Sequence, residues 1–270
     1  MPPDAYFFLT LALKMAITAG FVVVATTVAE RAGPLVGGLV ATLPLGAGPV
    51  YVFLALDHGP AFIAASAVNS LAINAANAIF AFVYALFAQK RSLLVSQSAA
   101  MLVWLALAWM IDEVNGTVSF GIALNLVVLT ACIVLSRSMR HASMPRTEAR
   151  WTDYVLRAAL VAVLVGITVT LSFRIGPGGS GILAVFPIIM ISVQIILHRR
   201  VGGKASAAVM AHAVVGLVGF AVACVVLHFT AVPFGSALGL SLALGASIAW
   251  SLLVYAARRR GIDSPRHCRA

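Results

Sequence analysis

The sequence predicts an all-α polytopic integral membrane protein with nine transmembrane helices, in which two inverted four-helix repeats flank one connecting helix. The first observation is composition: 62% of the 270 residues are hydrophobic and 10% are charged, whereas a soluble domain carries about 25% charged residues. The second is an internal repeat, because residues 13–59 return as residues 156–202 at a constant offset of 143, with 14 of the 47 aligned positions identical. The third is that the basic residues gather on one side of the predicted membrane.

Nine apolar stretches, each about 18 residues or longer, are long enough to cross a bilayer. They are predicted at about 6–29, 34–56, 60–88, 93–111, 117–136, 153–173, 180–198, 204–228 and 235–257. Their continuous apolarity excludes a closed β-barrel, whose strands alternate in polarity. The first stretch should persist as a helix and not be cleaved as a signal peptide, because Asp4 precedes it without a basic cluster and Lys14 interrupts it.

Connectors with Gly-Pro separate the first two spans of each copy, at Gly33-Pro34 and Gly176-Pro177. Glycine supplies the positive φ of a tight reversal, and proline opens the next helix. The spans and connectors divide the chain into residues 1–112, the first four-helix repeat; 113–152, the connecting helix and a basic cytoplasmic loop; 153–257, the second four-helix repeat; and 258–270, a basic cytoplasmic tail.

The basic residues orient the predicted spans. Alternating the spans across the membrane places 15 of the 18 Lys and Arg residues on one side and Arg174 alone on the other, with Lys14 and Arg157 inside spans. Basic residues accumulate on the cytoplasmic side, so the N-terminus is expected outside and the C-terminus inside a bacterial inner membrane. The net charge of +10 is therefore expected to orient the chain in the lipid bilayer and not to bind nucleic acid. The second copy begins an odd number of spans after the first, so the two copies are expected to be inverted.

Each copy carries a glycine that is followed six residues later by a proline, at Gly38 and Pro44 and again at Gly181 and Pro187. A proline within a helix removes one backbone hydrogen bond and clashes with the carbonyl four residues earlier. Broken helices at equivalent points of inverted repeats often mark the midplane site of a transporter. The alternative is a packing kink, in which the glycines let helices approach closely.

Lys14 and Arg157 are aligned by the repeat, and both lie inside apolar spans. A cation at the centre of a span costs at least about 2.5–3.5 kcal/mol and marks a functional site by default; the alternative is that both side chains snorkel to the headgroups. No span carries a central Asp or Glu, so the expected partners are cavity water, helix C-terminal carbonyls or an anionic ligand. Lys14 is expected to point into the bundle, near the Pro44 break and the face with Asn69 and Asn77.

Polar side chains form a row along the third predicted span. Its members are Ser66, Asn69, Ser70, Asn74 and Asn77. Asn69 and Asn77 are eight residues apart and share a helix face, and the repeat places His212 at the position of Asn69. These three are candidate substrate-binding residues, with hydrogen bonding between helices as the alternative explanation. Gln194, which aligns with Tyr51, is a weaker candidate.

Motifs of other classes are missing from the sequence. It contains no Walker motif, no Ser-His-Asp pattern at one depth and no HExxH, so an enzyme is disfavoured and no cofactor is expected. Cys132, Cys224 and Cys268 form no CxxC or Cys/His cluster, so neither a metal site nor a disulfide framework is predicted.

The four-helix unit resembles the small GlpM-type inner-membrane proteins of bacteria, so that the chain looks like a tandem version of that family. The residues that carry the resemblance are an embedded cation followed by Gly-x5-Pro, namely Lys14 with Gly38 to Pro44 and Arg157 with Gly181 to Pro187, together with Phe186, Phe229-Thr230 and Ser247 to Trp250 in the second copy. The resemblance covers both halves but neither the fifth span nor the central loop. It implies a link to production of the exopolysaccharide alginate and carries over no site residues.

The leading interpretation is a transporter-like protein that moves or binds an anionic small solute or a lipid-linked precursor. The competing interpretation is a membrane scaffold that transports nothing and supports envelope or exopolysaccharide biosynthesis. The sequence leaves open the substrate, the coupling ion, an anionic lipid ligand and a homo-oligomeric state.

Overall fold

The computed structural model describes residues 3–31, 46–114, 116–141 and 150–263, and these residues form helices and short connectors without a strand. Six helical stretches in this part of the chain are long and apolar enough to cross a membrane: Pro60–Ala88, Leu93–Val114, Val118–Leu135, Trp151–Val201, Gly203–Phe234 and Ser236–Ala257. Shorter apolar helices cover Phe8–Val24 and Ala47–Asp57. The prediction of a polytopic, all-helical membrane protein is therefore confirmed.

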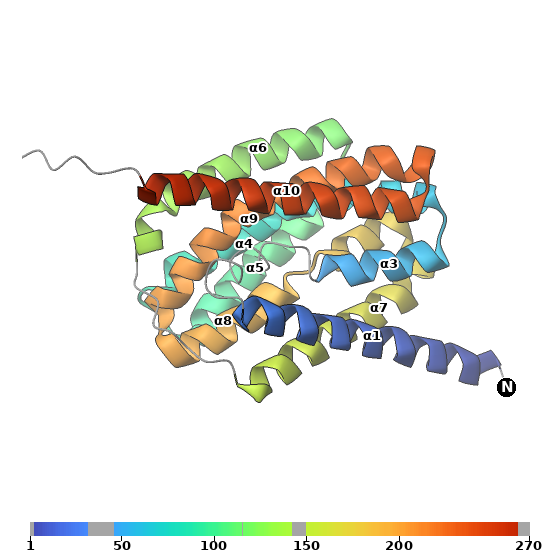
Figure 1. Ribbon diagram of the computed structural model, residues 1–270, viewed down its shortest axis with the longest axis horizontal. Coiled ribbons are helices and arrows are strands. Elements are labelled where there is room, and N and C mark those ends of the chain that lie inside the picture. Colours follow the sequence, from blue (N-terminus) through green and yellow to red (C-terminus); the bar gives the residue numbers. More distant parts are fainter. Residues whose placement is uncertain (1–2, 32–45, 115, 142–149, 264–270) are drawn as a thin grey trace, which may run out of the picture.

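The helices form one elongated bundle in which most run along the same direction (Figure 1). Their bounds are α1 (Pro3–Arg31), α3 (Ala47–Asp57), α4 (Pro60–Ala88), α5 (Leu93–Val114), α6 (Val118–Leu135), the 3₁₀ helix η1 (Arg137–His141), α7 (Trp151–Ala184), α8 (Ile188–Val201), α9 (Gly203–Phe234) and α10 (Ser236–Asp263). Helix α1 begins at one end of the bundle, at the right of Figure 1, and α10 ends at the opposite end. Helices α5 and α10 run beyond the predicted segment ends at 112 and 257.

Helix α7 covers the predicted span at 153–173 and the first residues of the predicted span at 180–198, most of which forms α8. The 51 residues from Trp151 to Val201 would extend about 75 Å as one helix, far more than the roughly 30 Å of a bilayer core. The chain turns at Gly176, whose φ of 67° and ψ of −170° interrupt the helical backbone. A positive φ of this kind is readily adopted only by glycine, so this turn requires the glycine of the Gly-Pro connector.

The direction of the chain after Gly176 follows from its hydrogen bonds to α4. Ser172, before the turn, bonds to His58 at the start of α4. After the turn, Gly181 bonds to Ser70, Val185 to Asn77 and His198 to Tyr84. The segment from 177 to 201 therefore runs alongside α4 in the same direction, whereas the segment before Gly176 runs towards the start of α4.

Helix bounds in the two halves of the chain correspond at the offset of the repeat. Helix α4 begins at Pro60 and α9 at Gly203, and α5 begins at Leu93 and α10 at Ser236; both differences are 143 residues. Helices α3 and α8 overlap in the same way. The correspondence continues beyond residues 13–59, where the sequence identity is concentrated.

Helices α4 and α9 pack against each other along most of their length, and they are antiparallel. The hydroxyl of Tyr84 lies 2.9 Å from that of Ser206, Asn74 donates to the carbonyl of Leu217 at 3.0 Å, and His228 bonds to the carbonyl of Ala64 at 2.9 Å. The residue number thus rises on α9 as it falls on α4. Asn74 and Leu217 are themselves repeat equivalents, 143 residues apart, so the two helices cross at the same position of each copy.

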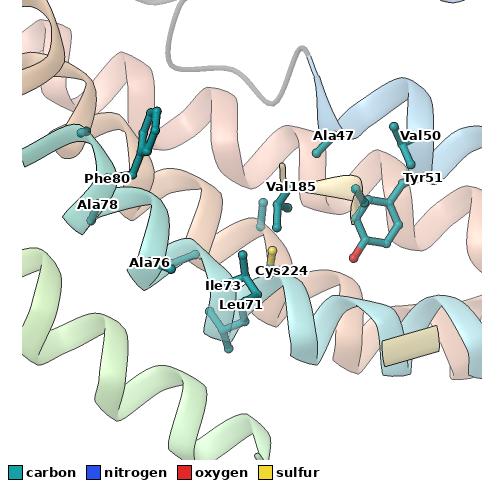
Figure 2. Close-up of a cluster of buried hydrophobic side chains, with 14 of the residues drawn as sticks. Ala47, Val50, Tyr51, Leu71, Ile73, Ala76, Ala78, Phe80, Val185 and Cys224 are labelled. Carbon is teal, nitrogen blue, oxygen red and sulfur yellow. The ribbon is translucent and has the colours of Figure 1, made fainter. Parts of the chain in front are cut away.

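The core lies around α4, which combines large and small buried side chains (Figure 2). Leu71, Ile73 and Phe80 are at most 1% exposed. Its buried alanines are Ala64, Ala67, Ala72, Ala75, Ala76, Ala78, Ala81, Ala85 and Ala88. Lipid tails are as apolar as these side chains, so close helix approach over small residues contributes more here than the hydrophobic effect does. On the outside, Leu102, Leu126 and Leu253 are 64–68% exposed, as expected of a surface that faces lipid.

Candidate functional site

A break in the helical backbone lies between α7 and α8, at residues 185–187. Helix α7 ends at Ala184, and Pro187 occupies the N-cap position of α8. Proline has no N–H to donate, so a helix readily begins at this point and does not run through it. The Gly38 and Pro44 of the first copy lie outside the described residues.

The polar row of α4 supplies hydrogen bonds to this broken segment. Ser70 Oγ donates to the carbonyl of Gly181 at 2.7 Å, and Asn77 Nδ2 donates to the carbonyl of Val185 at 2.9 Å. The indole Nε1–H of Trp104 donates to Asn77 Oδ1 at 2.6 Å, so both ends of the Asn77 amide are bonded. Carbonyls freed by a helix break must find partners within a membrane protein, and here they find them on α4.

The approach of the broken segment to α4 depends on glycine. A Cβ at Gly181 would collide with the backbone oxygen of Ser66 and lie 3.1 Å from Cβ of Asn69. Asn69 is half-buried and donates to the carbonyl of Ala65 at 3.4 Å. The structure thus brings Asn69 and Asn77 together with Gly181 and the residues just before Pro187.

A second polar contact joins α4, α6 and α9. Asn74 Nδ2 donates to Asn125 Oδ1 at 2.8 Å and to the carbonyl of Leu217. Asn125 Nδ2 donates to the carbonyls of Leu71 at 2.6 Å and Gly121 at 2.8 Å. These bonds fix the connecting helix α6 over the crossing of α4 and α9. They fit the alternative explanation of the polar row, in which its side chains form hydrogen bonds between helices and do not bind a substrate.

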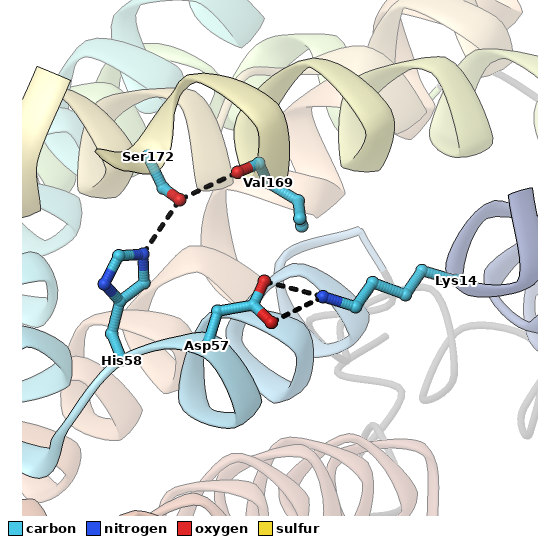
Figure 3. Close-up of polar contacts among 5 residues, drawn as sticks. All are labelled: Lys14, Asp57, His58, Val169 and Ser172. Carbon is cyan, nitrogen blue, oxygen red and sulfur yellow. Dashed lines mark hydrogen bonds and ion pairs between the residues drawn. The ribbon is translucent and has the colours of Figure 1, made fainter. Parts of the chain in front are cut away.

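Lys14 has a carboxylate partner, so the prediction that it would lack one is wrong. Its Nζ lies 2.6 Å from both carboxylate oxygens of Asp57, the last residue of α3 (Figure 3). The two side chains are 18% and 20% exposed, and Nζ also lies 5.8 Å from the ring centroid of Phe53. The sequence places Asp57 in a connector, and only the folding of α3 against α1 brings it to the depth of Lys14.

His58 continues this cluster towards α7. The Ser172 hydroxyl donates to the carbonyl of Val169 at 2.8 Å, so it accepts from His58 Nε2–H at 2.8 Å (Figure 3). The imidazole stacks on Phe62 with centroids 3.9 Å apart. Burial lowers the pKa of His58, and the charge of Lys14 acts in the same direction against the opposing charge of Asp57. His58 is therefore expected to be neutral at pH 7.

The second half carries a comparable ion pair of opposite polarity. Arg200, near the end of α8, contacts Asp153, in the first turn of α7, through two nitrogens at 2.6 and 2.7 Å. Asp153 also accepts from the backbone N–H of Arg150 at 2.9 Å and so caps α7. Arg200 is the repeat equivalent of Asp57, so both halves join their first helix to the end of their second by a charge pair.

The remaining predicted site residues lie elsewhere in the bundle. Arg157 is half-buried on α7, one turn after Asp153, and His212 is half-buried on α9. The structure therefore does not gather the two embedded cations with the Asn69 and Asn77 face. Asp57 and Arg200 were missed, although the repeat aligns two charged residues there at the ends of apolar helices, which was a usable signal.

A further polar group lies where α4, α8 and α9 meet. The Tyr84 hydroxyl lies 2.9 Å from both His198 Nδ1 and Ser206 Oγ, and 3.5 Å from the carbonyl of Gln194. Tyr84 and Ser206 are fully buried. A hydroxyl in contact with both a ring nitrogen and a second hydroxyl can donate to one and accept from the other, so this group also fixes helices.

Two hollows lie away from the predicted binding residues. An open hollow of about 570 Å³ on α6 is lined by Leu126, Val127, Thr130, Ala131, Val134 and Leu135. A smaller hollow of about 230 Å³ is lined by Gln89, Ser138, Met139, Lys204 and Ala207. Among the described residues no group of three or more His, Cys, Asp or Glu side chains is placed to hold a metal ion.

Comparison of the chain with models of known protein families, with curated proteins and with solved structures finds no match.

Proposed function

We propose that this protein is a transporter-like inner-membrane protein built from two inverted repeats, which moves a polar solute or headgroup between the two faces of the membrane. The observation that carries the proposal is the antiparallel packing of α4 on α9, centred on the equivalent residues Asn74 and Leu217. Two equivalent helices that run antiparallel are related by a two-fold axis perpendicular to them. For helices that cross a membrane, such an axis lies in the membrane plane, which is the symmetry of many secondary transporters.

The course of the chain supports nine crossings. The turn at Gly176 divides the stretch Trp151–Val201 into two. Helices α1 and α3 belong to the predicted spans 6–29 and 34–56, which add two crossings to the six long stretches. With nine crossings the termini lie on opposite faces, in keeping with the opposite ends at which α1 begins and α10 ends (Figure 1). The excess of basic residues at the α10 end supports a cytoplasmic C-terminus.

The broken helix supports transport over a purely structural bundle. The carbonyls of Gly181 and Val185 accept hydrogen bonds from the Ser70 and Asn77 side chains of α4. Such bonds can be exchanged for bonds to a solute or water, whereas bonds within a helix cannot be exchanged without unfolding it. The segment lies at the level of the polar row in α4, where the sequence predicts the site.

The pairing of Lys14 bears on the charge of the proposed solute. Lys14 no longer favours an anion, because Asp57 neutralises it. The proposed solute class is the one that the sequence predicts, an anionic small solute or a lipid-linked precursor. The resemblance to GlpM-type proteins fits the competing proposal, a scaffold for envelope or exopolysaccharide biosynthesis.

Measuring distances between the halves distinguishes a transporter from a scaffold without knowledge of the substrate. Spin labels are placed, in a variant with Cys132, Cys224 and Cys268 replaced by alanine, at two pairs of exposed positions: Arg91 with Arg199 at the end where α10 finishes, and Glu113 with Arg174 at the other end. Alternating access requires a short and a long distance at each end of the bundle. When pH or added phosphate, sulfate or glutamate is varied, the fraction of the long distance should rise at one end as it falls at the other. One narrow, invariant distance at both ends would refute transport and favour the scaffold.

A further inference from the structure

Two buried carboxamides have no hydrogen-bond partner among the residues that the structure describes. Gln194 on α8 is 0% exposed, and neither its Nε2 nor its Oε1 is bonded. Both amide atoms of Gln97 on α5 are likewise buried and unbonded. A buried polar group left without a partner costs about 1–3 kcal/mol, and lipid tails cannot supply one. Water or a bound molecule can supply the partner that these residues do not.

Gln97 and Gln194 lie at the same level of the bundle on α5 and α8, which pack against each other. Trp104 contacts Phe186 with ring centroids 5.1 Å apart, which fixes the register of the two helices. Gln97 precedes Trp104 by seven residues and Gln194 follows Phe186 by eight, which correspond to about 10 and 12 Å along a helix. Because α5 and α8 run in opposite directions, both displacements point towards the Tyr84 end of α4.

The Tyr84 group lies beside the backbone of Gln194. The Tyr84 hydroxyl lies 3.5 Å from the backbone oxygen of Gln194 and 2.9 Å from Ser206. The hollow of about 230 Å³ lined by Gln89 and Ala207 lies about one turn further along α4 and directly after Ser206 on α9. Its lining lies at the end of the bundle where α4 ends and α9 begins.

We infer that Gln97 and Gln194 line a hydrated site between α5 and α8 that binds small uncharged polar molecules. Each carboxamide presents two N–H donors and one oxygen acceptor, which suits a ligand with both donors and acceptors, such as an amide or a polyol. An ion would lose its hydration without meeting an opposite charge on either glutamine. The site can exist without movement of the two halves. Its role as a binding site on a transport pathway rests on the proposed function.

Thiol modification tests the site with probes of defined charge. Gln194→Cys and Gln97→Cys are made one at a time in the variant that lacks Cys132, Cys224 and Cys268, and each is reacted in membrane vesicles. The probes are three methanethiosulfonates, the neutral 2-hydroxyethyl, the cationic 2-trimethylammonioethyl and the anionic 2-sulfonatoethyl reagents. Rates are divided by those with free 2-mercaptoethanol, so that intrinsic reactivity cancels.

The neutral reagent is expected to modify both cysteines at least tenfold faster than either charged reagent does. Ile196→Cys is the matched control, because Ile196 is buried on the same helix at 7% exposure and should stay unmodified. A single symmetric peak in fluorescence-detected gel filtration shows that each variant is folded. Because two positions are tested independently, the experiment still gives a result if one of the two variants does not fold. Absence of modification at both positions overturns the site, and faster reaction of the anionic reagent overturns its preference for uncharged molecules. Either result can occur whether or not the distances between the halves change, so failure of this inference is distinguishable from failure of the proposed function.

Discussion

The ion pair between Lys14 and Asp57 makes the most direct energetic prediction. Lys14→Met leaves the Asp57 carboxylate in a site where only a fifth of its side chain is exposed. Removing one partner of a fully buried pair costs about 3–5 kcal/mol, whereas an exposed pair contributes about 0–1 kcal/mol. With 18% and 20% exposure, we expect a loss of about 2 kcal/mol. This corresponds to roughly 4–8 °C in melting temperature if the protein behaves as a large two-state domain.

A double-mutant cycle separates the pair from other effects of the substitutions. Lys14→Met, Asp57→Asn and the double variant are purified in detergent, and their melting is followed by intrinsic fluorescence. Each single substitution leaves one charge without its partner, whereas the double substitution removes both charges. The double variant should therefore lose at least about 1 kcal/mol less free energy of unfolding than the sum of the losses in the two single variants. All variants should insert into membranes, since methionine lowers the insertion cost of the span.

Lys90→Met is the matched control, because Lys90 is an exposed lysine at the end of α4, and its melting temperature should stay within about 1 °C. Exchange of the two charges, with Lys14→Asp and Asp57→Lys combined, should recover part of the loss. Additive effects of the two single substitutions would refute the pairing and return Lys14 to a lysine that snorkels to the headgroups.

Three further predictions follow from single features of the fold. Gly181→Ala should destabilise the protein by about 1–3 kcal/mol, as overpacking does, because its Cβ meets the backbone of Ser66, whereas Gly178→Ala, with its nearest neighbour at 3.8 Å, should melt like the wild type. The pKa of His58 is lowered from 6.5 in the folded state, so below about pH 6.5 the unfolded chain binds more protons than the folded chain does. The melting temperature should therefore fall as the pH drops through this range, and it should fall less in His58→Gln. A reporter fused after Ala270 should be active only as a cytoplasmic reporter, and periplasmic activity there would contradict both the orientation and the inversion.

The membrane character and several helix bounds could be predicted from the sequence because they depend on local composition. The stretch Pro60–Ala88 was predicted to the residue, since Pro60 opens the helix after Gly59 and nothing polar enough to end it occurs before Gln89. The interruption of the helical backbone at Gly176 lies in the predicted Gly-Pro connector, because such a connector has a specific backbone requirement. Length and turn chemistry carry this information without reference to the rest of the chain.

Side-chain partners were harder to predict, because they depend on which helices meet. Lys14 and Asp57 are 43 residues apart, and nothing in either local sequence indicates the other. The sequence predicted the polar row of α4 as a set, but it did not predict that its members bond to different helices. Asn77 bonds to the broken segment after Gly176, and Asn74 bonds to α6 and α9. That division follows from the angular position of each side chain around a helix that is enclosed on several sides.

The two ion pairs show what the repeated structure has kept and what it has not. Asp57 and Arg200 occupy equivalent positions with opposite charges, while Lys14 and Arg157 have kept the same charge. A cation at position 200 could not pair with a cation at 157, and the second half instead places Asp153 one turn earlier on α7, within 2.6 Å of Arg200. The residues have therefore diverged while the tie between the first helix and the end of the second has been retained. Helices α3 and α8 end at opposite ends of the bundle (Figure 1), so each ion pair secures a different end, which is the arrangement that the proposed inversion of the two copies would produce.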